Sequence, residues 1–152
     1  MITMAKFMSN EWMTLYENAL NKNEAYAKAA SWWTGDFVFI VKASGNLDHD
    51  IMGFIGLSHG KCTETKPIAS ANEFEVVAPG GSPSSPDKFP VEYTYEATHD
   101  TWITIIKGEL DPIRALLSGK AKIQGDMAKV LKATEAAKEL VRTASVIETE
   151  FY

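Results

Sequence analysis

Residues 108–128 read GELDPIRALLSGKAKIQGDMA, and this stretch decides the fold of the C-terminal third of the chain. Asp111 can accept hydrogen bonds from the free backbone N–H groups at the start of a helix, and Pro112 suits the first helical position because its φ angle is already helical. Gly119 can adopt the left-handed conformation that ends a helix. The stretch therefore predicts a short helix between Asp111 and Gly119. Its inward-facing side chains are Ile113, Leu116 and Leu117.

Further elements lie on both sides of this helix. Residues 121–124 are expected to form a short strand, and Asp126 can cap a long terminal helix. The inner stripe of the terminal helix contains Met127, Val130, Leu131, Thr134, Ala137, Val141 and Ala144. On the N-terminal side, Asp100 or Thr101 opens a turn of helix that Gly108 closes. That turn carries Trp102, Ile105 and Ile106 on its inner face.

The N-terminal end is predicted to form two helices. Ser9 can cap the first helix, and Asn23 can cap a second, shorter one that ends by Gly35. Apolar side chains recur with the spacing of one buried helical face. In the first helix this face contains Trp12, Leu15, Tyr16, Ala19 and Leu20, and in the second it contains Tyr26, Ala29, Ala30 and Trp33.

The middle of the chain has the patterns of strands. Residues 37–41 and 51–57 are apolar on both faces, as in interior strands, whereas 73–78 and 91–98 alternate apolar and polar residues, as in antiparallel strands with a wet outer face. Residues 79–90 contain four prolines and predict an exposed hairpin loop. The element order predicts one α+β domain over 1–152, with two layers and a five-stranded, largely antiparallel sheet covered by helices.

Composition limits the class of protein. A chain of 152 residues, 45% of them hydrophobic, is long enough to bury a core without disulfides. Cys62 is the only cysteine, which favours a reducing compartment, and no apolar stretch is long enough for a secretory signal or a membrane span. We therefore expect a cytoplasmic protein. The net charge of −5 argues against nucleic-acid binding, which depends on cationic side chains.

One segment differs from the acidic average. Residues 107–142 carry 8 Lys and Arg against 5 Asp and Glu, so the segment is locally basic at +3. It is interpreted either as an ordinary solvated helical surface or as a weak docking face for anionic head groups or a nucleotide-bearing acyl carrier. Contact with membrane surfaces is expected to be weak at most and sensitive to salt.

The sequence shows few side chains arranged for catalysis. His49 lies between two aspartates and His59 lies three residues before Cys62, but neither fragment is a complete ligand set, so no metal site is predicted. The paired carboxylates Glu73 with Glu75 and Glu92 with Glu96 fall on the sheet face expected to be exposed, where ordinary pKa values are expected. No catalytic residue, no cofactor and no enzymatic activity are predicted.

The stretch from Trp102 to Ala128 resembles the C-terminal signature of the sterol carrier protein type 2 (SCP-2) domain family. That signature runs from an amphipathic turn through a glycine, a short helix, a Gly-Lys-x-Lys-Ile strand and Gly-Asp before the last helix. The resemblance implies an SCP-2-like fold, in a small stand-alone member of prokaryotic type. It also implies a tunnel between sheet and helices that accepts sterols, fatty acids, acyl-CoAs or other lipids. The ending Glu148–Tyr152 is not a peroxisomal signal.

Binding or transfer of an apolar ligand is therefore the leading functional hypothesis. We expect inward-facing side chains on the enclosing elements to line the cavity, with the last helix closing over the sheet. These are Trp32, Phe39, Phe54, Trp102, Ile106, Leu117, Met127 and Leu131. The alternative is an accessory domain that docks to an enzyme of acyl or thioester metabolism and has no ligand of its own. A homodimer is compatible with either hypothesis.

Overall fold

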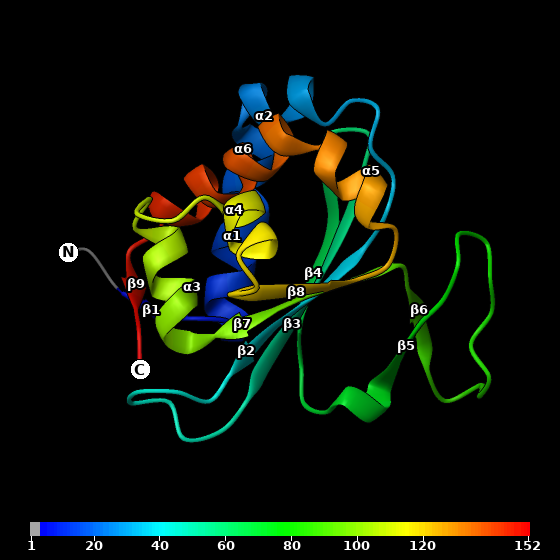
Figure 1. Cartoon of the computed structure of the whole chain (residues 1–152), viewed down its shortest axis with the longest axis horizontal. Coiled ribbons are helices and arrows are strands. Elements are labelled where there is room, and N and C mark those ends of the chain that lie inside the picture. Colours follow the sequence, from blue (N-terminus) through cyan, green and yellow to red (C-terminus); the bar gives the residue numbers. More distant parts are fainter. Residues whose placement is uncertain (1–3) are drawn as a thin grey trace.

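The computed structural model describes residues 4–152 and contains a five-stranded sheet in the order β4-β3-β2-β7-β8 (Figure 1). The strands are β2 (Phe37–Lys42), β3 (Ile51–Ser58), β4 (Lys61–Ile68), β7 (Tyr93–Thr98) and β8 (Ala121–Gln124). Neighbouring strands are antiparallel, except that β2 and β7 are parallel. The predicted α+β class with a largely antiparallel five-stranded sheet is confirmed.

The α-helices gather on one side of this sheet (Figure 1). They are α1 (Asn10–Lys22), α2 (Glu24–Ala29), α3 (His99–Ile106), α4 (Pro112–Leu117), α5 (Met127–Lys132) and α6 (Thr134–Ser145). The predicted caps Ser9, Asn23, Asp111 and Asp126 each accept a hydrogen bond from a backbone N–H in the first turn of their helix. Local capping chemistry therefore fixes where four of the helices begin.

Two details of the helical predictions are wrong. The cap of α3 is Thr98, whose hydroxyl accepts a hydrogen bond from the backbone N–H of Thr101 at 3.1 Å, so the helix begins before Asp100. On α1, Leu15 is 40% exposed, whereas the neighbouring Met13 is fully buried. The buried face of α1 is thus turned slightly from the face that the apolar spacing indicates.

The predicted long terminal helix is broken into α5 and α6 at Ala133. This residue has φ −95° and ψ 30°, and no side chain caps the start of α6. The break changes the rotational phase of the two helices. Val130 and Ala144 are buried as predicted, but Leu131, which a continuous helix would turn inward, is 37% exposed.

The sequence does not predict β4, the edge strand of the sheet. Residues 61–68 are mostly polar and include Pro67, and both features are tolerated at an edge, where one side of the strand makes no ladder hydrogen bonds. Residues 73–78, predicted as one of the five strands of the sheet, instead contribute β5 (Phe74–Val76), after a single 3-10 turn over Ala71–Glu73. Strand β5 lies outside the main sheet.

Strand β5 pairs with β6 (Phe89–Val91), and the two are parallel. Residues 77–88 are therefore a crossover between parallel strands, and the prediction of a hairpin loop over residues 79–90 is wrong. In Figure 1 the β5–β6 pair projects from the sheet on the side away from the helices. We call residues 71–91 the flap.

The flap buries the sheet face that the alternation of residues 91–98 predicts to be wet. Its apolar cluster consists of Val38, Met52, Phe54, Ile68, Phe74 and Val91. Two carboxylates for which the sequence predicts ordinary pKa values, Glu92 and Glu75, depart from them. Burial raises the pKa of Glu92, whose Oε2 atom has no hydrogen-bond partner, and hydrogen bonds from Ser84 lower the pKa of Glu75.

A two-stranded parallel pair joins segments from opposite ends of the chain. Strand β1 (Ala5–Lys6) pairs with β9 (Thr149–Glu150). The pair places Phe7 beside Phe151, with ring centroids 5.3 Å apart. The buried residues Ala5 and Phe7 are thereby fixed against the helical side of the sheet.

Candidate functional site

The main cavity lies between the helices and the sheet and has a volume of about 80 Å³. Its sheet wall comes from β2 and β7, through Phe37, Phe39 and Tyr95. Helix α3 contributes Trp102, Ile105 and Ile106, and α6 contributes Ala137, Leu140, Val141 and Ala144. The N-terminal segment and α1 add Phe7, Met8, Trp12 and Tyr16, and α4 and α5 add Pro112, Ile113 and Val130.

The cavity arises because large rings face small side chains. Trp12 stacks on Tyr16 with ring centroids 5.1 Å apart, and Trp102 lies 5.5 Å from Phe39 and 5.4 Å from Tyr95. These rings hold the elements apart. The facing α6 wall presents mainly alanine and valine side chains, which are too short to fill the intervening space.

The polar atoms of the lining tyrosines and tryptophans all have hydrogen-bond partners within the protein. The hydroxyl groups of Tyr16 and Tyr95 donate to the backbone oxygens of Leu140 and Pro112, each at 2.8 Å. The indole N–H groups of Trp12 and Trp102 likewise donate at 2.8 and 3.0 Å, to Thr149 and to the backbone of Ile40. Burial raises the pKa of both tyrosines. The cavity surface is therefore apolar.

A groove adjoins the main cavity at the surface, between the α3–α4 turn and α6. It has a volume of about 320 Å³ and is lined in part by Lys107, Lys138 and Arg142, and we call it the basic groove. The residues common to groove and main cavity are Ile105, Ile106, Pro112 and Val141. These side chains form a thin partition between the two spaces.

A smaller space of about 40 Å³, the inner cavity, lies at the other end of α6. Its lining includes Trp33 and Leu57. The residues shared with the main cavity are Phe37, Val130, Ala137 and Leu140. The basic groove, the main cavity and the inner cavity therefore follow one another along α6.

Comparison with known proteins identifies this architecture. Residues 65–138 match the model of the SCP-2 sterol transfer family. These residues belong to the SCP-2 family. The match covers the stretch in which the sequence resemblance lies, so the predicted family is confirmed. No curated protein matches the sequence of the chain.

Solved structures extend the likeness to almost the whole chain. A crystal structure of sterol carrier protein 2 is 26% identical, covers 93% of this chain and 99% of its own, and has a TM-score of 0.75. A hypothetical protein of Thermus thermophilus, described as a candidate sterol carrier protein, is 25% identical, with coverages of 99% and 97% and a TM-score of 0.74. Sterol carrier protein 2 of Yarrowia lipolytica shares the fold, at 16% identity, 95% and 98% coverage and a TM-score of 0.53.

Three of the eight residues expected to line a ligand cavity lie in the wall of the main cavity. They are Phe39, Trp102 and Ile106. Trp32, Leu117 and Leu131 are instead 46%, 69% and 37% exposed. Phe54 lies on the opposite sheet face beneath the flap, and Met127 packs against the helical core but does not line the main cavity.

Each misplaced residue has a local physical reason. Leu117 lies at the last position of α4, where the helix has already turned its side chain outward. Leu131 follows the buried Val130 on the short helix α5, so its side chain points about 100° away from that buried face. Phe54 lies on a strand that is apolar on both faces, so alternation cannot tell which face its ring occupies.

The N-terminal contribution to the cavity is missing from the sequence prediction. Trp12 and Tyr16 are predicted to be buried on α1, but nothing local shows that they and Phe7 face the same space as α6. Pairing of β1 with β9 brings them there. This contact joins residues at opposite ends of the chain and leaves no periodic signal.

Groups with catalytic potential lie apart from the cavity. Burial is the main cause that raises the pKa of the Cys62 thiol, to about 12, so it stays protonated at neutral pH. Among residues 4–152, no three His, Cys, Asp or Glu side chains gather as a metal site. In the same part of the chain, no helix is both long and apolar enough to cross a membrane.

Proposed function

We propose that this SCP-2 protein binds an apolar ligand between the sheet and α6 and carries it without chemical change. The ligand class is a sterol-like lipid, a fatty acid or an acyl-CoA. The observation that carries the proposal is the main cavity, whose walls are apolar and whose tyrosine and tryptophan polar atoms all bond elsewhere. Sites for apolar ligands have this character, with few polar groups directed inward.

The size of the main cavity sets a condition on binding. Its volume of about 80 Å³ is well below the roughly 300–1,000 Å³ of typical ligand pockets. A lipid can enter only if the wall moves and joins the main cavity to the spaces on either side. Helix α6 is the element that borders all three spaces, so its displacement is part of the proposal.

The proposal treats the whole chain as one binding domain that works in the cytoplasm. Both points continue the expectations from the sequence, through its single cysteine and its element order. A carrier needs no nucleophile or general base. The protonated, buried Cys62 thiol supports the absence of thiol catalysis.

Filling the main cavity tests the proposal. Ala137 borders both the main and the inner cavity, so Ala137→Leu places extra carbon where the ligand would lie. We expect binding of a fluorescent fatty acid, followed by energy transfer from tryptophan, to weaken at least about tenfold. The Tm should change by no more than roughly 4 °C, since filling a cavity offsets the strain of overpacking.

Ala128→Leu is the matched control, because it adds the same atoms at an exposed position of α5. Its binding should equal that of the unmodified protein. The proposal would be overturned if the unmodified protein bound no sterol, fatty acid or acyl-CoA. In that case the docking-domain alternative would be favoured, and the partner would be sought among enzymes of acyl metabolism.

A further inference from the structure

We infer that the basic groove is the entrance to the main cavity and binds the anionic head group of a long-chain amphiphile whose chain lies beneath α6. The inference rests on the proposed function and deepens it, because it names the ligand class and the position of the head group. The head group is a carboxylate or a phosphate. An uncharged lipid of the same chain length lacks the feature that the groove recognises.

The first argument is the continuity of the three spaces. Ile106 and Val141 each contact the basic groove on one side and the main cavity on the other, so a displacement of single side chains joins the two. Ala137 and Leu140 do the same between the main and inner cavities. The combined space is a channel under α6 and not one rounded chamber.

The length of this channel favours an extended ligand. Helix α6 has 12 residues, which at 1.5 Å per residue make about 18 Å. Ser145, near its end, lines the basic groove, and Ala136, near its start, lines the inner cavity. A flexible acyl chain can follow such a narrow path, which a rigid fused-ring ligand fits only after a wider displacement of the helix.

The second argument is the charge at one end of the channel. Lys107, Lys138 and Arg142 line the basic groove, and Asp111 is the only carboxylate among its lining residues. The Asp111 carboxylate already accepts hydrogen bonds from the backbone N–H groups of Ile113 and Arg114, both at 2.9 Å. The groove therefore presents three cations and one carboxylate to a ligand, next to an apolar interior. Two of the cations, Lys138 and Arg142, also form ion pairs, with Glu135 at 3.4 Å and with Glu139.

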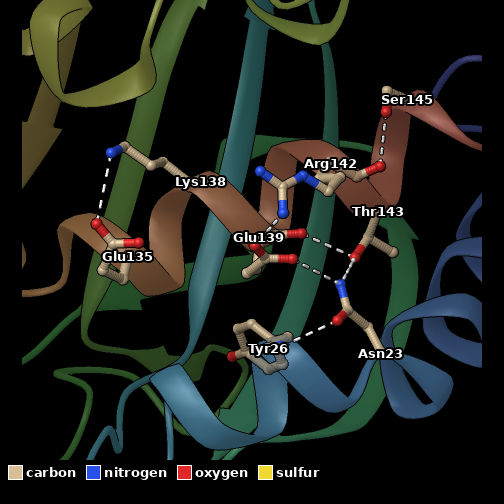
Figure 2. A network of polar contacts seen from close by, with 8 residues as sticks. All are labelled: Asn23, Tyr26, Glu135, Lys138, Glu139, Arg142, Thr143 and Ser145. Atoms are coloured by element: carbon tan, nitrogen blue, oxygen red, sulfur yellow. Dashed lines mark hydrogen bonds and ion pairs between the residues drawn. The ribbon is translucent and has the colours of Figure 1, made fainter.

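Arg142 can hold a ligand anion while keeping its ion pair. Its Nη1 atom lies 2.6 Å from Oε2 of Glu139, and Figure 2 shows Glu139 and Thr143 directed toward Asn23, the N-cap of α2. A guanidinium group has five N–H donors, so this pair leaves others available. The Arg142 side chain is 67% exposed, which leaves it accessible from the groove.

The third argument is that, within the described part of the chain, hydrogen bonds tie α6 to neighbouring helices on one side only. On the α1–α2 side, Tyr16 donates to the backbone oxygen of Leu140, and Asn23 donates to Glu139 and Thr143 at 3.3 and 3.0 Å (Figure 2). Within residues 4–152, no hydrogen bond or ion pair joins the α3–α4 turn to α6. The seam that borders the basic groove can therefore open with the loss of apolar contacts alone.

Matched ligands and variants test the inference. Hexadecanoate, hexadecyl phosphate and hexadecanol, each below its micellar concentration, are titrated into the protein, and binding is followed by tryptophan fluorescence. We expect Arg142→Gln to weaken binding of the two anions about five- to tenfold and Lys107→Gln about two- to threefold, while hexadecanol binding changes less than twofold. Lys61→Gln, an exposed lysine on edge strand β4, is the control and should change nothing.

The outcomes separate this inference from the proposed function. Equal affinity for hexadecanol and hexadecanoate, unchanged by either groove variant, would overturn the head-group site and leave the carrier function standing. Failure of all three ligands to bind would overturn the head-group site, and failure of a sterol and an acyl-CoA as well would overturn the carrier function. Arg142→Gln leaves the Glu139 carboxylate without its ion-pair partner and could unfold the protein for that reason. In that case Lys107→Gln alone tests the head-group site, because it breaks no ion pair among the described residues. Stronger weakening for the carboxylate or for the phosphate identifies the head group.

Discussion

The two faces of the five-stranded sheet are both apolar, but they are covered in different ways. On the helical face, aromatic rings meet the small side chains of α6 and leave the main cavity. On the flap face, Phe54 meets Phe89 edge to face with ring centroids 5.3 Å apart, and the ammonium group of Lys66 lies 4.4 Å from the Phe89 ring. No residue of the flap cluster lines any of the three spaces along α6.

This difference shows that the cavity depends on the combination of side chains, and that hydrophobicity alone does not produce it. The flap face combines branched, sulfur-containing and aromatic side chains of similar reach, which interdigitate and close. The helical face opposes rings to Ala137 and Ala144, and neither side can cross the gap. We therefore expect the flap face to supply stability and the helical face to supply binding.

The largest expected effect is on the flap face. Phe54→Ala should lower the free energy of unfolding by about 3 kcal/mol and the Tm by roughly 6–12 °C, because a buried ring is removed from a closed cluster. Fatty-acid affinity, measured below the new melting range, should be unchanged. A parallel loss of affinity and stability would show that the two faces are not independent.

A smaller effect is expected on the partition between the basic groove and the main cavity. Ile106→Ala should cost about 2 kcal/mol, near the low end for such a truncation, because one side of Ile106 already borders a void. Its distinguishing effect is kinetic. With the partition thinned, hexadecanoate should associate several-fold faster in a stopped-flow experiment, and an unchanged or slower association would contradict the proposed entrance.

Removal of a helix cap on the helical face should affect stability alone. Asp126→Ala removes the acceptor for the backbone N–H of Lys129, at 3.2 Å, and should lower stability by about 1 kcal/mol. Asp126 lies outside the main cavity and the groove, so binding should persist. Thermal melts and a ligand titration on the same sample test this, and loss of binding at unchanged Tm would give Asp126 a role in function.

The smallest expected effect comes from the protonation of His99, which is 1% exposed. Burial lowers its pKa below the usual value, and its Nε2 atom accepts a hydrogen bond from the backbone N–H of Tyr152 at 3.3 Å. The unfolded state therefore takes up the proton first, so the contribution to stability is present above about pH 6.5 and is lost as the pH falls through the folded-state pKa.

This pH dependence can be isolated by comparison with a His99→Phe variant. The Tm of the unmodified protein should fall by about one or two degrees more than that of the variant between pH 7.5 and 5.5. The comparison is needed because burial raises the pKa of Asp36 and Glu92, whose titration changes stability in the opposite direction. Equal pH profiles for the two proteins would show that the pKa of His99 is the same in the folded and the unfolded state.

Features of the fold that depend on local chemistry are readable from the sequence. Asp111 followed by Pro112 fixes the start of α4, and the caps Ser9 and Asn23 fix α1 and α2, because each acts on backbone groups within three residues. Strand β4 has no such signal, since its place depends on pairing with β3 at a sheet edge. The sequence gives no sign of the helix break at Ala133 either, because alanine is a strong helix former.

The candidate site divides in the same way. Trp102 and Ile106 follow from the inward face of a helix with clear stops, whereas Phe39 lies on a strand that is apolar on both faces, so alternation does not fix its side. The basic groove cannot be predicted from the sequence alone, although its three cations belong to the segment 107–142, which is basic by composition. Only the packing of α6 against the α3–α4 turn brings Lys107 beside Arg142.

The pairing of β1 with β9 has a consequence for the order of folding. Ala5 pairs with Thr149, whereas the parallel pairing of β2 with β7 joins Phe37 to Tyr93, so the first contact closes a far longer loop. The additional chain entropy amounts to roughly 0.8 kcal/mol, which favours late formation of the β1–β9 contact. During synthesis, the part of the cavity wall that contains Phe7 cannot form until residues 149–150 have been made. A nascent chain therefore completes its five-stranded sheet before its binding site is complete.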